Sequence, residues 1–273
     1  MNGGTLELDK EGIRINKYLS ESGVCSRREA DRQIALGNIS IDGRTAGVGD
    51  RVLPGQQVLF CGQEIQKEKE EILLLVHKPV GIVCTAEKRE KNNIVDYLSY
   101  PKRIYPVGRL DKDSSGLLLM TNQGNLVNKI MRAGNMHEKE YLVTVNKPLT
   151  QEFLRGMAQG VPIKELSVMT RKCLVEEVDS KTFRIVLTQG INRQIRRMCE
   201  YFNYRVVALQ RIRIMNLKLG DLKPGTYREI SARELTELKK QLQYSASTPV
   251  RPASEPRWGV KGKPTTSGKM PKH

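Results

Sequence analysis

The sequence predicts two folded units that each combine helices with strands. The chain has 273 residues, which is more than one average domain needs. A charged run at 66–71 lacks turn glycines and apolar residues, and a continuous apolar run at 72–76 follows it directly. We therefore expect five parts: a tail at 1–11, a first unit at 12–66, a linker at 67–71, a second unit at 72–244, and a disordered basic tail at 245–273.

Periodicity places two short helices and a hairpin in the first unit. Ile15 and Leu19 lie four residues apart, as one face of a helix requires. The capping-box sequence Ser26-Arg27-Arg28-Glu29 predicts the start of a second helix. The alternating residues 39–41 and the turn sequence Asp42-Gly43 then predict a hairpin.

The charge balance indicates a polyanionic partner, with nucleic acid as the first candidate. A formal net charge of +16 and a pI near 9.7 favour phosphate binding, because bound lysines and arginines release condensed counterions. Arg27 and Arg28 fall in the first turn of the second predicted helix. The helix dipole disfavours each cation there by roughly 0.3–1 kcal/mol, whereas free N–H groups attract phosphate. The alternative is that both arginines are solvated and pair with Glu29 or Asp31.

Other classes of protein do not fit the composition. The five cysteines are scattered without CxxC spacing, which is typical of a reducing compartment and offers no paired zinc ligands. The start of the sequence lacks the cationic and apolar regions of a signal peptide. No long basic amphipathic helix is present, and the apolar run at 72–76 is too short to cross a bilayer. We expect a soluble cytoplasmic protein without a metal.

A polar segment of the second unit precedes a predicted buried strand. Residues 108–117 read Gly-Arg-Leu-Asp-Lys-Asp-Ser-Ser-Gly-Leu and lead into the apolar run at 117–120. Carboxylates, cations and hydroxyls between two glycines fit a tightly turned active-site loop held on a rigid scaffold. An ordinary surface turn has a similar composition. Asp111 is the candidate catalytic group of this segment.

A later helix is predicted to expose clustered arginines. Asn192 can cap it, and its apolar residues recur at helical spacing and should pack inward: Ile195, Met198, Cys199 and Phe202. Arg193, Arg196 and Arg197 then share the opposite face. For Arg193 and Arg197 we expect solvent or a nucleic-acid backbone as the partner.

The last regular elements of the second unit are a strand and a helix. Residues 211–215 alternate as a strand, so we expect Arg211 and Arg213 on one face, either solvated or in contact with nucleic acid. A second capping box, Ser231-Ala232-Arg233-Glu234, opens the final helix.

The first unit resembles the S4 RNA-binding domain over about residues 12–65. The resemblance is carried by Ser-Arg-Arg-Glu-Ala-Asp at 26–31 and Gly-Asn-Ile-Ser-Ile-Asp-Gly at 37–43. It implies that the second helix holds structured RNA. The contacts that the resemblance implies come from Asn16, Lys17, Arg27, Arg28 and Arg32.

The second unit resembles the RsuA-like family of RNA pseudouridine synthases. The family motifs, in order, are Lys78-Pro79-Val80-Gly81, the segment 108–117, the strand sequence Glu138-Lys139-Glu140-Tyr141-Leu142-Val143, and Gln194-Ile195-Arg196-Arg197-Met198. The string 137–145 and Asn192-Arg193-Gln194 are most similar to the RluF-type enzymes of 23S ribosomal RNA. Many relatives carry His where this chain has Arg193, so no role is transferred to that position.

The family resemblance implies a fold and an activity. The expected fold is α+β, with a mixed and mostly antiparallel sheet in the second unit. The implied reaction breaks the N1–C1′ bond of a flipped uridine, turns the uracil and rejoins it through C5, without cofactor or metal. Structured RNA is the implied partner, a ribosomal stem-loop first and transfer RNA second, and we expect a monomer with no membrane contact.

The family motifs also imply roles for individual residues. Asp111 acts as nucleophile or as base for the ribose 2′ proton, and Tyr141 stacks on the flipped base. Arg196 pairs with Asp111, which we expect to be buried beside it. Arg109 enters the space that the base leaves. The remaining substrate contacts are expected from Lys78, Gln194 and Arg197.

Two other functions compete with this interpretation. In the first, the second unit has lost its catalytic activity, and the chain is an RNA-binding or ribosome-assembly factor. Alternatively, Asp111, Asp113 and Asp96 can hold magnesium in a nuclease. Apart from that nuclease hypothesis, we expect Asp113 to be a solvent-facing loop residue, because a second negative charge would oppose ionisation of Asp111.

Overall fold

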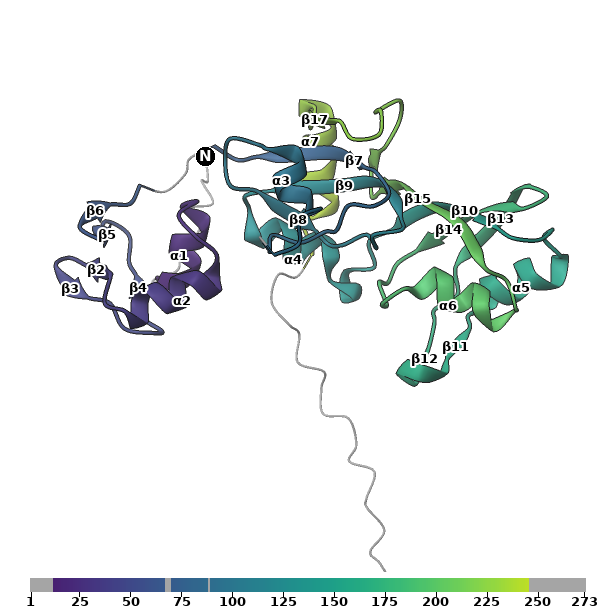
Figure 1. Cartoon of the computed structure of the whole chain (residues 1–273), viewed down its shortest axis with the longest axis horizontal. Coiled ribbons are helices and arrows are strands. Elements are labelled where there is room, and N and C mark those ends of the chain that lie inside the picture. Colours follow the sequence, from purple (N-terminus) through teal and green to yellow (C-terminus); the bar gives the residue numbers. More distant parts are fainter. Residues whose placement is uncertain (1–11, 67–69, 88, 246–273) are drawn as a thin grey trace, which may run out of the picture.

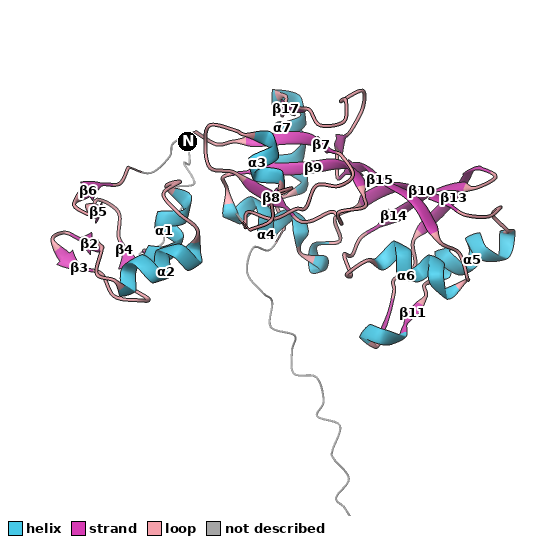
Figure 2. Cartoon of the chain, viewed as in Figure 1, coloured by secondary structure: helices cyan, strands magenta, loops and turns pink. Residues whose placement is uncertain are grey.

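The computed structural model of the chain describes residues 12–66, 70–87 and 89–245 (Figure 1). The predicted N-terminal tail, most of the predicted linker and nearly all of the predicted C-terminal tail lie outside the described residues. Both units contain helices and strands, as Figure 2 shows. The prediction of two units that mix helices with strands therefore agrees with the structure.

The first unit packs two helices against short strands. Helices α1 (Ile15–Glu21) and α2 (Arg27–Ala35) contact each other, and Ser26 caps α2 by accepting a hydrogen bond of 3.2 Å from the Glu29 N–H. The four-stranded sheet has the order β3 (Arg44–Thr45), β2 (Ile39–Ile41), β5 (Val58–Phe60), β6 (Gln63–Glu64). Separately, β1 (Ile13–Arg14) pairs with β4 (Arg51–Val52). Both predicted helices and the predicted hairpin are present.

The second unit is built on one large mixed sheet. Its strand order is β13 (Leu174–Asp179), β14 (Thr182–Leu187), β10 (Lys139–Val145), β15 (Val206–Ile214), β9 (Ser115–Thr121), β7 (Leu73–Lys78), β17 (Tyr227–Glu229). Two further strands join it, β16 (Leu217–Lys218) beside β15 and β8 (Tyr105–Val107) beside β9. All pairs are antiparallel except β9 with β15. This agrees with the predicted mixed, mostly antiparallel sheet.

One half of this sheet, β7 and β9, is covered on both faces. Helices α4 (Gly124–Met131) and α7 (Ala232–Gln241) contribute to the core on one face, and α3 (Ile94–Leu98) contributes on the other. Leu75 and Leu119 point to the first core, while Leu74 and Leu118 point to the second. A strand buried on both faces has no polar side, which explains the continuous apolar runs in the sequence.

The other half of the sheet, β10, β14 and β13, has one apolar face. Helices α5 (Gln151–Gln159) and α6 (Gln194–Tyr201) supply the core beneath it, where Phe153 and Met198 pack on Val143 and Ile185. A short hairpin of β11 (Pro162–Ile163) and β12 (Val168–Met169) extends from this half (Figure 1). The opposite face carries charged side chains, described below.

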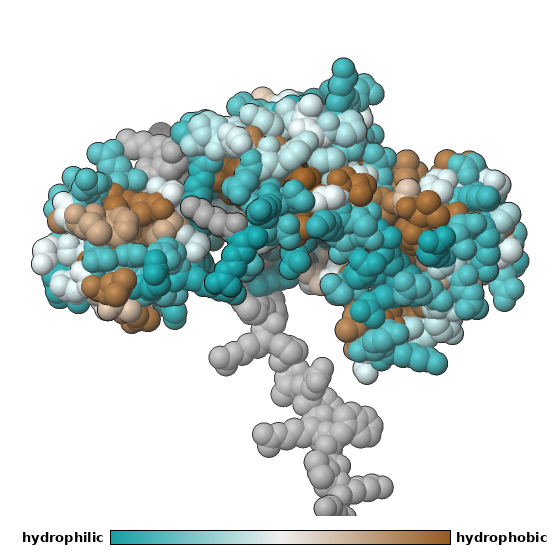
Figure 3. All heavy atoms as spheres, in the orientation of Figure 1, coloured by the Kyte–Doolittle hydropathy of each residue, from teal (hydrophilic) through white to brown (hydrophobic). Residues whose placement is uncertain are grey.

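One face of the molecule is mainly polar (Figure 3). The face in Figure 3 is predominantly hydrophilic, and its hydrophobic side chains gather in separate patches. Within the described ranges, no helix has both the length and the apolar character that crossing a bilayer requires.

Candidate active site

A pocket of about 350 Å³ lies where the two halves of the sheet meet. Its walls come from the loop that precedes β9, from β10 and β15, and from the start of α6 with the loop before it. Five of the predicted site residues line it together: Arg109, Asp111, Tyr141, Gln194 and Arg196. Two predicted substrate contacts, Lys78 and Arg197, are not among its lining residues.

Backbone hydrogen bonds hold the loop that carries Asp111. The Leu110 N–H donates to Cys84 Sγ over 3.4 Å, and the Gly81 N–H donates to the Lys112 carbonyl over 2.7 Å. Lys78 is fully buried, and its ammonium donates to the carbonyls of Ser114 (2.7 Å) and Pro79 (2.8 Å). Lys78 therefore lies behind the loop and outside the pocket lining. It positions the loop and does not make the predicted substrate contact.

Two arginines face the Asp111 carboxylate at a distance. Asp111 Oδ2 lies 3.9 Å from Arg196 Nε and 3.7 Å from Arg193 Nη1. The Asp111 side chain is 32% exposed and that of Arg196 only 8%, so the expected buried carboxylate is instead open to the pocket. Arg196 Nε is buried without a hydrogen-bond partner. Contacts of this length can tighten when substrate is bound.

Asp113 takes part in the same cluster. Its carboxylate lies 3.1 Å from Arg196 Nη2 and 3.6 Å from Arg193 Nη1, although its side chain is 50% exposed. Arg196 Nη2 also donates to the Asp113 carbonyl and to Ser114 Oγ. Asp113 is thus half-exposed as expected, but it is paired rather than simply solvated, and Arg196 ties the loop to α6.

The N-terminus of α6 differs from the prediction in its cap and in the partners of its side chains. Its N-cap residue is Arg193, which has a left-handed backbone (φ 51°) and makes no side-chain cap, so the predicted Asn192 cap is wrong. Arg196 is buried in the pocket wall beside Asp111. Arg197 donates to the Asn192 carbonyl and to Glu165, both over 3.1 Å. Gln194 lines the pocket, but its side-chain oxygen accepts from the Ile191 N–H over 3.2 Å.

A β-bulge brings a further arginine into the pocket. The register between β10 and β15 shifts between Glu140 and Tyr141, so that Glu140 pairs with Arg213 and Tyr141 with Arg211. The bulge places Arg211 on the pocket side and Arg213 on the opposite face, and the predicted single basic face is wrong. Alternation in the sequence does not reveal a bulge.

Lys139 was also missed as a site residue. It lies two residues before Tyr141 on the same strand, is buried, and lines the pocket. Burial, together with the positive charge of Arg211, lowers the pKa of Lys139 to about 8. The sequence signal that could have identified Lys139 is the alternation along the strand, because residues 139 and 141 share a face.

Gly116 allows the two halves of the sheet to join beside the pocket. It has φ 103° and pairs in parallel with Arg211. A Cβ at position 116 would lie 2.2 Å from the Arg211 carbonyl oxygen, so only glycine permits this approach. The second glycine of the 108–117 segment is therefore required by the packing of β9 against β15.

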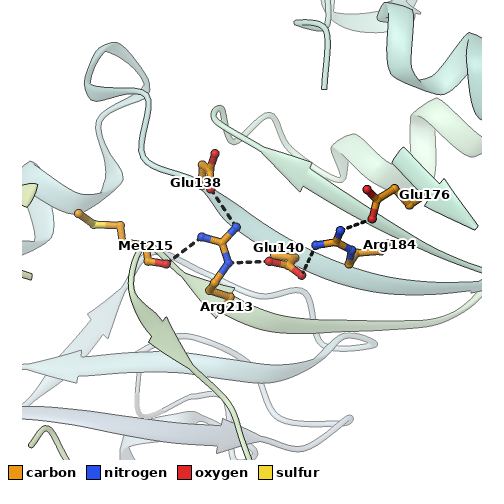
Figure 4. Close-up of polar contacts among 6 residues, drawn as sticks. All are labelled: Glu138, Glu140, Glu176, Arg184, Arg213 and Met215. Carbon is orange, nitrogen blue, oxygen red and sulfur yellow. Dashed lines mark hydrogen bonds and ion pairs between the residues drawn. The ribbon is translucent and has the colours of Figure 1, made fainter. Parts of the chain in front are cut away.

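A network of charged side chains covers the face of β10 opposite the pocket (Figure 4). Glu140 accepts hydrogen bonds from Arg213 Nε (2.5 Å) and Arg184 Nη1 (3.0 Å), and these arginines also bind Glu138 and Glu176. Burial alone would raise the pKa of Glu140, but the two arginines outweigh it and lower the pKa. The network ties β10 to β14 and β15 directly behind Lys139 and Tyr141.

The predicted RNA contacts of the first unit differ in their availability. Arg27 and Arg28 are exposed, and neither pairs with Glu29 or Asp31 as the alternative required. The other three already bind within the unit: Asn16 donates to Asp31, Lys17 pairs with Glu21, and Arg32 pairs with Glu29.

The three carboxylates of the nuclease hypothesis do not come together. Asp96 accepts a hydrogen bond from Asn93 at the start of α3 and does not line the pocket. In the part of the chain that the structure describes, no group of three or more His, Cys, Asp or Glu side chains is arranged to hold a metal ion.

Comparisons with known proteins match both units. A family model described as RNA pseudouridylate synthase matches residues 72–201, and the S4 domain model matches residues 13–58. The "Dual-specificity RNA pseudouridine synthase RluF" of Escherichia coli K12 is 52% identical over 263 residues, covering 96% of this chain and 88% of that protein. The "Ribosomal large subunit pseudouridine synthase B" of Bacillus subtilis is 32% identical, covering 83% and 95%.

A solved structure shares the fold. The crystal structure of a pseudouridylate synthase superposes with a TM-score of 0.62 at 24% identity, covering 83% of this chain and all of that one. With an S4 domain, a synthase domain and this extent of identity, the chain belongs to the RsuA-like family of S4-domain RNA pseudouridine synthases and is of the RluF type.

Proposed function

We propose that this chain converts uridine to pseudouridine at a defined site in large-subunit ribosomal RNA, with Asp111 as the catalytic group. The observation that carries the proposal is the shared pocket. Asp111, Tyr141 and Arg196 come from three separate elements, and all three line one cavity at the junction of the sheet halves.

The pocket suits a base that has left its stack. Unstacking a nucleotide costs about a few kcal/mol, and stacking on an aromatic ring recovers about 1–3 kcal/mol. Tyr141 supplies such a ring, partly exposed in the pocket wall. Arg109 is exposed at the rim, where it can occupy the place that the flipped base leaves in the RNA.

The reaction conserves the atoms of the nucleotide. The N1–C1′ bond breaks, the uracil turns, a C5–C1′ bond forms, C5 loses its proton and N1 gains one. Asp111 serves this sequence in its ionised form, either by attacking C1′ or by taking the ribose 2′ proton. Arg193, at the N-cap of α6, and Arg196, within α6, lie 3.7 Å and 3.9 Å from this carboxylate.

The substrate class follows from the relatives and from the first unit. The Bacillus relative is named for the large ribosomal subunit, and the Escherichia coli relative is named as having dual specificity. A ribosomal stem-loop is therefore the first substrate we propose, and a transfer RNA stem-loop is the second. Arg27 and Arg28 at the N-terminus of α2 are exposed and form no ion pair with another described residue, so they can bind phosphates of either stem.

The proposal is tested with purified enzyme and RNA from cells that lack the gene. Carbodiimide treatment and primer extension map pseudouridine in ribosomal RNA and transfer RNA, with excess EDTA present. We expect one new modified position in large-subunit ribosomal RNA and no strand cleavage. Product confined to transfer RNA would overturn the substrate proposal, and no pseudouridine in any RNA would overturn the function.

The RNA contacts of the first unit are tested by salt dependence of binding. Replacing Arg27 and Arg28 by Ala removes two phosphate contacts, and the slope of log K against log salt should fall by roughly 1.5. Arg233→Ala, which removes an exposed arginine at the start of α7, is the matched control. An unchanged slope in the double variant would contradict the assignment.

A further inference from the structure

Two buried cations of the pocket have no carboxylate partner among the described residues. Lys139 is 4% exposed, and the hydrogen bond it donates goes to the His137 carbonyl over 3.1 Å. Arg211 is 1% exposed; its Nε donates to the Leu117 carbonyl over 2.7 Å, and its Nη2 has no hydrogen-bond partner. Both side chains line the pocket.

The pocket is therefore divided by charge. On the loop side, Arg193 and Arg196 face the carboxylates of Asp111 and Asp113. On the strand side, Lys139 and Arg211 face no carboxylate of the described chain. Burying a cation without a counter-charge is unfavourable by several kcal/mol, so such a pair indicates that a ligand brings negative charge to this wall.

We propose that Lys139 and Arg211 form a binding site for the uracil anion that is released when the N1–C1′ bond breaks. This inference rests on the proposed function and adds a catalytic role for two residues on β10 and β15. The electron pair of the broken bond passes into the uracil ring, where the charge spreads over N1, O2 and O4. The electron deficiency left at C1′ is compensated either by attack of the Asp111 carboxylate or by loss of the 2′ proton. Both routes therefore release the same anion.

The register places the two cations beside the stacking ring. Tyr141 pairs directly with Arg211 across β10 and β15, where Cβ atoms of opposed residues lie about 5 Å apart. Lys139 lies two residues earlier on the same face, about 6.6 Å along the strand. A uracil stacked on Tyr141 thus has its carbonyl edges within reach of both side chains, while Asp111 remains for the sugar.

Preorganised donors at a developing anion act on the chemical step more than on binding. Removing one such donor lowers the rate by about 10²–10³-fold in other enzymes. We expect Lys139→Gln to lower the single-turnover rate by about that factor and to leave the Kd for RNA within threefold. Lys218→Gln, at an exposed position on β16, is the matched control and should leave both quantities unchanged.

The decisive comparison uses a better leaving group. Fluorine at C5 stabilises the uracil anion, so RNA with 5-fluorouridine at the target position depends less on the protein cations. Loss of the N-glycosidic nucleoside is measured by digestion and mass spectrometry. The ratio of wild-type to Lys139→Gln rates should shrink at least fivefold on the fluorinated RNA, and Lys139→Arg should recover much of the rate on uridine.

Three outcomes would overturn the inference. Equal rate ratios on the two RNAs would mean that Lys139 acts on structure rather than on the anion. If Lys139→Gln instead bound RNA more weakly, with a smaller salt dependence of binding, and regained its rate at saturating RNA, the two cations would bind a phosphate of the RNA. A full rate in Lys139→Gln would remove the role altogether. Failure of the proposed function is distinct, because wild-type enzyme would then make no pseudouridine.

The pH profile gives a second readout. Six other titratable or charged groups line the pocket around Lys139: Arg109, Asp111, Tyr141, Arg193, Arg196 and Arg211. Because arginines keep their charge, loss of the Lys139 proton should slow the wild-type enzyme as the pH rises through about 8, the pKa of Lys139. Lys139→Arg should retain its rate above that pH. The same decline in that variant would contradict the inference.

Discussion

The two halves of the large sheet differ in how their faces are covered. Strands β7 and β9 are buried on both faces, between α3 on one side and α4 with α7 on the other. Strands β10 and β14 have an apolar face over α5 and α6, and a charged face outside. The first half is thus covered on both faces, the second half has one charged face, and the pocket lies at their boundary.

The difference shows where the chemistry can be placed. The loop with Asp111 leads into β9 and is held by buried groups of the first half, Lys78 and Cys84. Tyr141 and Lys139 come from the second half, where the charged network lies behind them. Each half thus fixes one side of the pocket, and the two sides meet through the β9 and β15 pairing.

The largest expected effect comes from breaking that junction. Gly116→Ala puts a Cβ 2.2 Å from the Arg211 carbonyl oxygen at a φ that side chains rarely adopt. We expect a loss of at least about 3 kcal/mol in the free energy of unfolding, measured by urea denaturation. Gly134→Ala, an exposed position with no close neighbour, is the control. Equal stability of the two variants would contradict the described junction.

Matched leucine substitutions test the difference in burial between the halves. Leu74 on β7 is 1% exposed, whereas Leu142 on β10 is only half-buried on the outer face. Leu74→Ala should lower the free energy of unfolding by about 2–5 kcal/mol, and Leu142→Ala by about 1 kcal/mol or less. Similar losses at both positions would mean that the outer face of β10 is covered.

The charged network should contribute a smaller, pH-dependent effect. Glu140→Gln removes the charge that accepts from Arg184 and Arg213, and we expect a loss of about 1–3 kcal/mol at pH 7. The pKa of Glu140 is lowered in the folded state from its usual 4.5, so the stabilisation is complete above that pH. It should disappear as the pH falls through the lowered value.

Glu177→Gln on β13 is the control for this network, because Glu177 is exposed on the edge strand. Its free energy of unfolding should stay within about 0.5 kcal/mol of wild type. Parallel pH curves for wild type and Glu140→Gln between neutral and acidic pH would show that Glu140 does not titrate as described.

Local sequence patterns predicted part of the fold. Continuous apolar runs predict the doubly covered strands, and capping boxes predict the helices that begin after Ser26 and Ser231. The motifs of the known family predicted that Asp111, Tyr141 and Arg196 share one site, and all three line one pocket. The strands and the helix starts are local features that local patterns predict, whereas the shared pocket was predicted only through the resemblance to a known family.

Tertiary pairing explains what the sequence did not predict. The bulge at Glu140 separates Arg211 from Arg213, although their spacing places them on one face of a regular strand. The ammonium of Lys78 is held by the carbonyl of Ser114, 36 residues later in the chain. Arg193 has a left-handed backbone although it is not glycine. A charged side chain in the sequence is equally compatible with solvent, an ion pair or a buried site.

One measurement tests the central claim most directly, namely that Asp111 in the junction pocket carries the reaction. Single-turnover pseudouridine formation is compared for Asp111→Asn and Asp113→Asn, with RNA affinity measured for both. We expect Asp111→Asn to lose at least about 10³-fold in rate and Asp113→Asn to lose no more than about tenfold, with Kd values within a few-fold. Full activity of Asp111→Asn, or an equal loss in the two variants, would contradict the account.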